Sequence, residues 1–108
     1  MKRIRSHSPV ATEAAKLLGQ NIRLARQQHL WTLQELADRV GVSKITMIKV
    51  ERGDLTVGLG IAFEAAAVSG VPLFTADRSR LHLEADRLDD RLALLPHAVR
   101  KRQIDNDF

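Results

Sequence analysis

The 108-residue chain is long enough for one small domain, carries a formal net charge of +4 at pH 7, and contains no cysteine, which excludes disulfides and thiolate metal sites. No apolar run approaches the ~20 residues that a membrane-spanning helix needs, so we expect no membrane contact and a cytoplasmic location. The charge is uneven, because residues 1–53 hold ten Lys/Arg against four Asp/Glu, whereas residues 54–108 hold seven against nine. This asymmetry favours a polyanion-binding face in the first half.

The chain begins with a basic segment, residues 1–11, that we expect to form a flexible N-terminal arm, although Ser8 and Pro9 offer an alternative helix start within it. Such an arm can follow a nucleic-acid backbone or stay free, and the sequence leaves both interpretations open. Residues 12–28 have the pattern of a first helix, because Leu18, Ile22 and Ala25 recur at helical spacing on one face.

The next stretch, residues 33–52, has the pattern of two short helices joined by a tight turn. Thr32, followed three residues later by Glu35, forms a capping box that opens the first of them. Gly41 ends that helix, since glycine enters the left-handed conformation without steric cost. Trp31, just before the capping box, can pack on this helix or stack on a base; as the only tryptophan, with no neighbouring aromatic residue, it is expected to pack.

The second short helix is capped by Ser43 and closed by Gly53. Met47 and Val50, three residues apart, are its expected inward-facing residues. A small residue at Ala37 and the tight turn between the helices suit two helices that cross at a steep angle. The stretch therefore has the pattern of a helix-turn-helix.

Residues 26–53 resemble the helix-turn-helix of the phage-repressor (Xre-like) family, with Ile22, Arg26, Glu51 and Gly53 in register. The resemblance implies an all-α fold, a compact bundle of about five helices of the lambda-repressor-like DNA-binding type. It also implies a buried ion pair between Arg26 and Glu51. We interpret both residues as structural, because a buried charge without its partner is costly.

In such a domain the second helix of the pair enters the major groove of double-stranded DNA. Lys44 can then donate to a guanine or neutralise a phosphate, and Ile45 can contact a thymine methyl group. The resembling family often has glutamine where this chain has Leu33, so only a main-chain phosphate contact is expected there. The full set of expected DNA-binding residues is Ser43, Lys44, Ile45, Thr46, Lys49 and Arg52.

Two further helices follow. Thr56 is expected to cap a helix that reaches Ser69 and is ended by Gly70. The last helix is expected over residues 77–95, where apolar residues recur at steps of four and three. This apolar stripe either closes the core of the domain or meets a second copy or a partner; its residues are Leu81, Ala85, Leu88, Leu92 and Leu95.

The expected organisation is therefore a helix-turn-helix DNA-binding domain over residues 12–74, a C-terminal helix over 75–95 and a disordered tail over 96–108. Catalysis is not expected, because the chain has no glycine-rich phosphate loop and no metal-binding motif, and we expect neither a cofactor nor a metal. The four histidines are scattered; they are His7, His29, His82 and His97.

The second part of the chain carries a further resemblance. Residues 51–74, the leucine-rich helix after them and the arginine-rich tail resemble HipB-type antitoxins. These are dimeric repressors that bind a HipA-type kinase toxin and repress their own operon. The resemblance implies a homodimeric repressor on an inverted-repeat operator, with a HipA-type kinase toxin as partner. The alternatives are a free-standing Xre-like regulator without a toxin, or a protein-binding module that has lost DNA binding.

Overall fold

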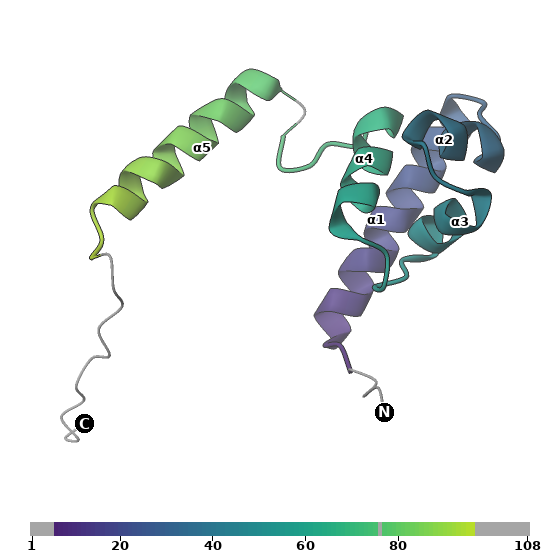
Figure 1. The fold of residues 1–108 in the computed structure, drawn as a ribbon, viewed down its shortest axis with the longest axis horizontal. Coiled ribbons are helices and arrows are strands. Elements are labelled where there is room, and N and C mark those ends of the chain that lie inside the picture. Colours follow the sequence, from purple (N-terminus) through teal and green to yellow (C-terminus); the bar gives the residue numbers. More distant parts are fainter. Residues whose placement is uncertain (1–5, 76, 97–108) are drawn as a thin grey trace. The chain divides into compact units, whose positions relative to one another are not determined.

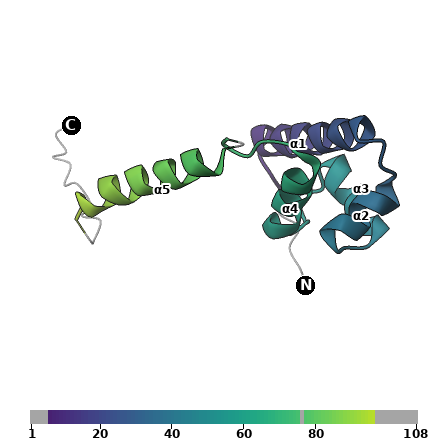
Figure 2. The same cartoon turned by 90° about the horizontal axis from the view of Figure 1, so that it is seen from above.

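The computed structural model describes residues 6–75 and 77–96. These residues form five α-helices, shown in Figures 1 and 2, and no strand beyond an isolated bridge between Leu73 and Thr75. The prediction of an all-α fold with about five helices is confirmed. The helices are α1 (Pro9–Gln28), α2 (Leu33–Val40), α3 (Lys44–Arg52), α4 (Leu59–Ser69) and α5 (Arg78–Ala93). None of them is both long enough and apolar enough to cross a membrane.

The chain divides into two units, residues 1–76 and residues 77–108. In the first unit α1 packs against α3 and α4, and α2 packs against the same two helices (Figure 1). Each helix therefore contributes residues to one core. As predicted, Ile22, Met47 and Val50 face inward. The buried apolar residues are Ile22, Leu36, Ala37, Met47, Val50, Ala65 and Ala66.

Helix α1 begins three residues earlier than the sequence pattern indicated. The Ser8 hydroxyl accepts a hydrogen bond from the Ala11 amide at 3.1 Å, and Pro9 occupies the first helical position. Proline suits this position because its φ is already helical and its missing N–H would have no partner there. Residues 9–11 therefore belong to the helix and not to the expected arm, whose residues 1–5 lie outside the described part of the chain.

Helix α2 opens with the predicted capping box. The Thr32 hydroxyl accepts from the Glu35 amide at 3.0 Å, and the Glu35 carboxylate accepts from the Thr32 amide at 2.9 Å. Trp31, immediately before the cap, is half-buried and packs against the core, as predicted. Its ring also stacks on His29 with centroids 4.2 Å apart, and the Arg39 guanidinium lies 4.1 Å from its centroid. The tryptophan is thus enclosed by its own domain.

Helix α4 begins at Leu59, two residues later than predicted. Thr56 is not its cap; instead its amide and its hydroxyl both donate to the Asp54 carboxylate, at 2.8 and 2.6 Å. This local turn holds Thr56 in the loop and moves the cap to Gly58, which offers no side-chain hydrogen bond. The helix ends at Gly70, as predicted, with φ at +87°.

The second unit contains one helix among its described residues. Asp77 caps α5 by accepting from the Ser79 amide at 2.9 Å, and the helix ends at Ala93, two residues before the predicted end. No residue of α5 is buried. The expected disordered tail lies almost wholly outside the described residues, since the description stops at Pro96.

Candidate nucleic-acid interface

The C-terminal half of α3 lies directly against the backbone of α1. A Cβ atom at Gly19 would lie 2.5 Å from the carbonyl oxygen of Glu51, which is closer than any side chain can approach. A Cβ atom at Gly53, where φ is +75°, would lie 2.6 Å from the backbone nitrogen of Lys16. Two glycines, one from each segment, therefore allow the two backbones to meet.

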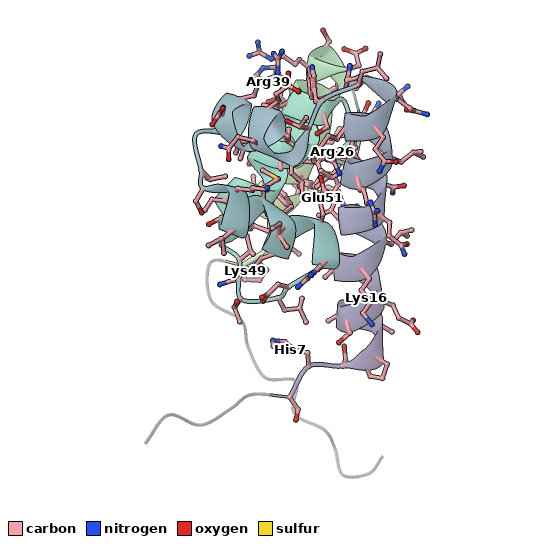
Figure 3. All side chains as sticks on the ribbon, turned by 90° about the vertical axis from the view of Figure 1, so that its right-hand side faces the viewer. His7, Lys16, Arg26, Arg39, Lys49 and Glu51 are labelled. Atoms are coloured by element: carbon pink, nitrogen blue, oxygen red, sulfur yellow. The ribbon has the colours of Figure 1, made fainter. Side chains whose placement is uncertain are left out.

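An ion pair fixes the same end of α3. The Arg26 guanidinium donates to both carboxylate oxygens of Glu51, from Nε at 2.7 Å and from Nη2 at 3.1 Å, and Figure 3 places this pair between α1 and α3. Its third nitrogen donates to the carbonyl oxygen of Trp31 at 2.9 Å. The side chains are only 11% and 7% exposed. This geometry confirms the predicted ion pair and ties α3 to both α1 and the start of α2.

The N-terminal end of α3 is set by the turn after α2. Gly41 adopts φ of +84°, and the Val42 amide then donates to the Ala37 carbonyl at 3.0 Å. The Ser43 hydroxyl accepts from the Thr46 amide at 3.1 Å and donates to the Thr46 hydroxyl at 3.0 Å. Ser43, an expected DNA contact, therefore uses its side chain to start the helix, which leaves the Thr46 hydroxyl proton available to an outside acceptor.

The predicted base-reading residues lie on the side of α3 that faces away from the core. Ile45 is 68% exposed, and Lys44 and Lys49 are also exposed. Figure 3 shows the Lys49 side chain extending outward from α3. Met47 and Val50 are buried on the other side. One set of side chains therefore packs α3 against the core, and a different set is exposed to the solvent.

A pocket beside the outward face joins α3 to the start of α4. It is lined by Thr46 and Lys49 from α3 and by Thr56, Val57, Gly58 and Ile61 from the following segment. The first amides of α4 have no capping side chain, since Gly58 occupies the cap position. Free amides at a helix start beside a lysine suit a phosphate oxygen. The sequence analysis expected such a main-chain contact at the start of α2 and did not single out the start of α4, where a glycine in place of a capping side chain was the signal.

A second pocket lies on the opposite flank of α3, next to the start of α2. It contains two exposed arginines, Arg23 from α1 and Arg52 from α3, with Leu33 and Ile48 between them, and the Arg26–Glu51 pair also lines it. Because Glu51 neutralises Arg26, the cations that can meet a phosphate are Arg23 and Arg52. Arg52 was predicted as a contact, whereas Arg23 was not.

Hydrogen bonds lower the pKa of two carboxylates near the interface. The Thr56 hydroxyl, and after it the Thr56 amide, holds the pKa of Asp54 below its ordinary value of 3.8. The Thr32 amide, and after it the Thr32 hydroxyl, holds the pKa of Glu35 below its ordinary value of 4.5. These hydrogen bonds favour the ionised carboxylates, which stabilise the turn before α4 and the start of α2.

Comparison with known families also identifies a helix-turn-helix in this part of the chain. Residues 22–74 match the family model described as helix-turn-helix. The match spans the C-terminal part of α1 and all of α2, α3 and α4, and so contains the Arg26–Glu51 pair and the outward face of α3, whereas Gly19 lies before it. Domains of this kind are used by DNA-binding transcription regulators. A search of the curated proteins found no match.

Proposed function

We propose that the chain acts, through the helix-turn-helix of residues 22–74, as a sequence-specific DNA-binding repressor of transcription. The observation that carries the proposal is the division of α3 into an anchored side and an outward side. Two glycines and a buried ion pair hold the helix, while Lys44, Ile45 and Lys49 are exposed along it. A helix held in this way can enter the major groove without losing its packing.

The outward residues divide by chemistry. Lys44 and Lys49 donate to guanine O6 and N7 or to phosphates, and Ile45 contacts a thymine methyl group. Arg23 and Arg52 on one flank, and the first amides of α4 on the other, bind the DNA backbone on the two sides of the groove. The flanking contacts position α3, and the exposed residues of α3 read the sequence.

One helix of this length reads only a few base pairs. We therefore infer a two-fold homodimer on an inverted repeat, with half-sites ~10 bp apart or a multiple of that spacing. The two copies of α3 then enter successive major grooves on one face of the DNA.

The proposal is tested by selecting binding sites for the full chain from a random-sequence DNA pool. We expect an enriched inverted repeat, with an affinity that falls steeply as salt rises, because several phosphates are neutralised. Lys44→Ala should weaken binding to this site. Arg80→Ala removes the same charge from α5, which contributes none of the proposed DNA contacts, and should leave the affinity nearly unchanged. Failure to enrich any sequence, together with salt-independent binding, would favour the protein-binding alternative.

We further propose that this repressor is the antitoxin of a HipA-type kinase toxin and regulates its own operon. The proposal is supported by the resemblance of residues 51–74 and the helix after them to HipB-type antitoxins, and by the exposed leucines of α5. Co-purification with the kinase encoded beside it is the direct test. Deleting residues 96–108 should weaken the kinase complex and spare DNA binding. A chain with no kinase gene beside it and no co-purifying kinase would be a free-standing regulator.

A further inference from the structure

Helix α5 carries an apolar seam that no other described residue of its unit covers. The seam consists of Leu81, Ala85, Leu88 and Leu92, spaced by four, three and four residues. Its leucines are 39%, 55% and 63% exposed in chain order. A helix of this length is only marginally stable alone in water, and an amphipathic helix gains most of its stability by burying its apolar face. We therefore expect the seam to pack against another apolar surface.

The core of the first unit needs no residue from α5. Every buried apolar residue of that core comes from α1 to α4, and the half-buried residues packed against it lie between Leu18 and Leu73. Spacing of the seam matches the two core positions of a coiled-coil heptad, with Ala85 and Leu92 at one and Leu81 and Leu88 at the other. A second helix with the same spacing is the natural complement.

Charges beside the seam distinguish the two orientations of a helix pair. Glu84 and Arg91 occupy equivalent heptad positions on one edge of the seam, and Asp89 lies on the other edge. In a parallel pair of α5 helices Glu84 would face Asp89 of the second copy, so two like-charge contacts would oppose pairing. In an antiparallel pair Glu84 faces Arg91 of the second copy, and the two-fold axis repeats this attraction.

We propose that α5 is a self-association surface that pairs antiparallel with α5 of a second copy of this chain. In this arrangement Leu81 packs against Leu92 of the other copy, Ala85 packs against Leu88, and Glu84–Arg91 ion pairs close one edge of each seam. Within a single chain Glu84 has a weaker neighbour, Arg87 at 3.5 Å on the same helix face. The pairing specifies how the proposed homodimer is built, but its test requires no DNA, so the failure of either proposal can be recognised separately.

The first test measures the dimer dissociation constant of the full chain by sedimentation equilibrium. Leu88→Ala should raise this constant by at least about tenfold, because it removes a buried leucine from both copies. Leu83→Ala is the matched control: Leu83 lies in the same helix but off the seam, and its loss should leave the constant unchanged. An unchanged constant for Leu88→Ala would overturn the proposal. So would a monomeric wild type whose unfolding temperature falls with Leu88→Ala, because that result would place the seam against its own domain.

A second test decides the orientation. Glu84→Arg should weaken an antiparallel dimer, because the substituted guanidinium would face Arg91 of the second copy, and adding Arg91→Glu should restore it. The same single substitution would strengthen a parallel dimer by placing a cation opposite Asp89. Since the chain has no cysteine, mixing Leu81→Cys chains with Leu92→Cys chains gives an independent reading. Disulfides between unlike chains support the antiparallel pair, and disulfides between like chains overturn it.

Discussion

The carbonyl oxygen of Glu51 lies so close to Gly19 that a Cβ atom added to this glycine would be only 2.5 Å from it. Both residues belong to the contact between α1 and α3, and Glu51 also accepts the two hydrogen bonds from Arg26. The position of α3 thus depends on an absent side chain and on a buried charge pair at the same point of the fold.

Gly19→Ala should destabilise the domain strongly. The added methyl group meets backbone atoms, which cannot rotate away, so α1 and α3 must separate at a cost of roughly 1–3 kcal/mol or more. Gly60→Ala is the control, because a Cβ atom there meets nothing within 4 Å. It should raise stability by up to about 1 kcal/mol through helix propensity. Urea unfolding of both variants measures their free energies of unfolding. Equal changes in the two variants would contradict the close approach of α3 to Gly19.

Arg26→Leu and Glu51→Leu should each lower the free energy of unfolding by about 3–5 kcal/mol, because each leaves the other charge buried without its partner. The double variant should lose much less than the sum of the two, since it leaves no unpaired charge. Denaturant unfolding of the three variants measures this coupling. Additive losses would mean that the two side chains do not interact in solution.

Ile45→Ala should reduce the preference for thymine at one position of each half-site without affecting folding, because Ile45 is largely exposed. Replacing that thymine with deoxyuridine removes the methyl group from the DNA side and should weaken wild-type binding by a similar factor. Combining both changes should give little further loss. Binding titrations on the selected site measure the cycle, and a full additive loss would place Ile45 away from the methyl group.

Leu30→Gly should be more stable than Leu30→Ala by about 1 kcal/mol, because a residue with a Cβ atom is strained in the left-handed region. Leu30 has φ of +61° and is 88% exposed, so both variants lose the same exposed side chain. Only glycine also relieves the backbone, at the position after α1 where helices commonly end in glycine. Thermal unfolding of the two variants is the measurement. If alanine were the more stable, Leu30 would not hold this conformation.

The capping box should make α2 sensitive to acid. Because the pKa of Glu35 is lower in the folded chain than its ordinary value of 4.5, the folded state favours the ionised carboxylate. This contribution to the stability of the folded state is fully present above pH 4.5 and is lost as the pH falls through the pKa that Glu35 has in the folded chain. Glu35→Gln keeps a hydrogen-bond acceptor that does not titrate, so its unfolding temperature should fall less over this range. If the unfolding temperatures of the wild type and of Glu35→Gln fell equally with pH, the loss of stability in acid would come from other groups.

Local signals in the sequence were sufficient for the parts of the fold that depend on neighbouring residues. The capping box at Thr32, the left-handed turn at Gly41 and the cap at Ser43 each involve residues within a few positions, and all three have the predicted geometry. Thr56 failed as a predicted cap because Asp54, two residues earlier, accepts hydrogen bonds from its amide and its hydroxyl and holds it in the loop. The sequence is compatible with Thr56 as a helix cap and with Thr56 bonded to Asp54, and it does not show which of the two is more stable.

The features that sequence reasoning missed depend on contacts between distant segments. Gly19 reads locally as a weak point within a helix, and its purpose is visible only once Glu51 lies beside it. Arg23 reads as an ordinary exposed residue until α1 and α3 bring it to the same pocket as Arg52. The Arg26–Glu51 pair was predicted only because of the family resemblance, since nothing in either segment alone indicates the other.

The split between the holding and the displayed residues of α3 has an evolutionary consequence. Positions 44, 45 and 49 can mutate without creating a cavity or stranding a charge, so under the proposed DNA contacts a descendant of this protein can acquire a new target sequence while its melting temperature stays constant. Diversification among duplicated copies should therefore concentrate at these three positions and leave Met47, Val50 and Glu51 nearly invariant.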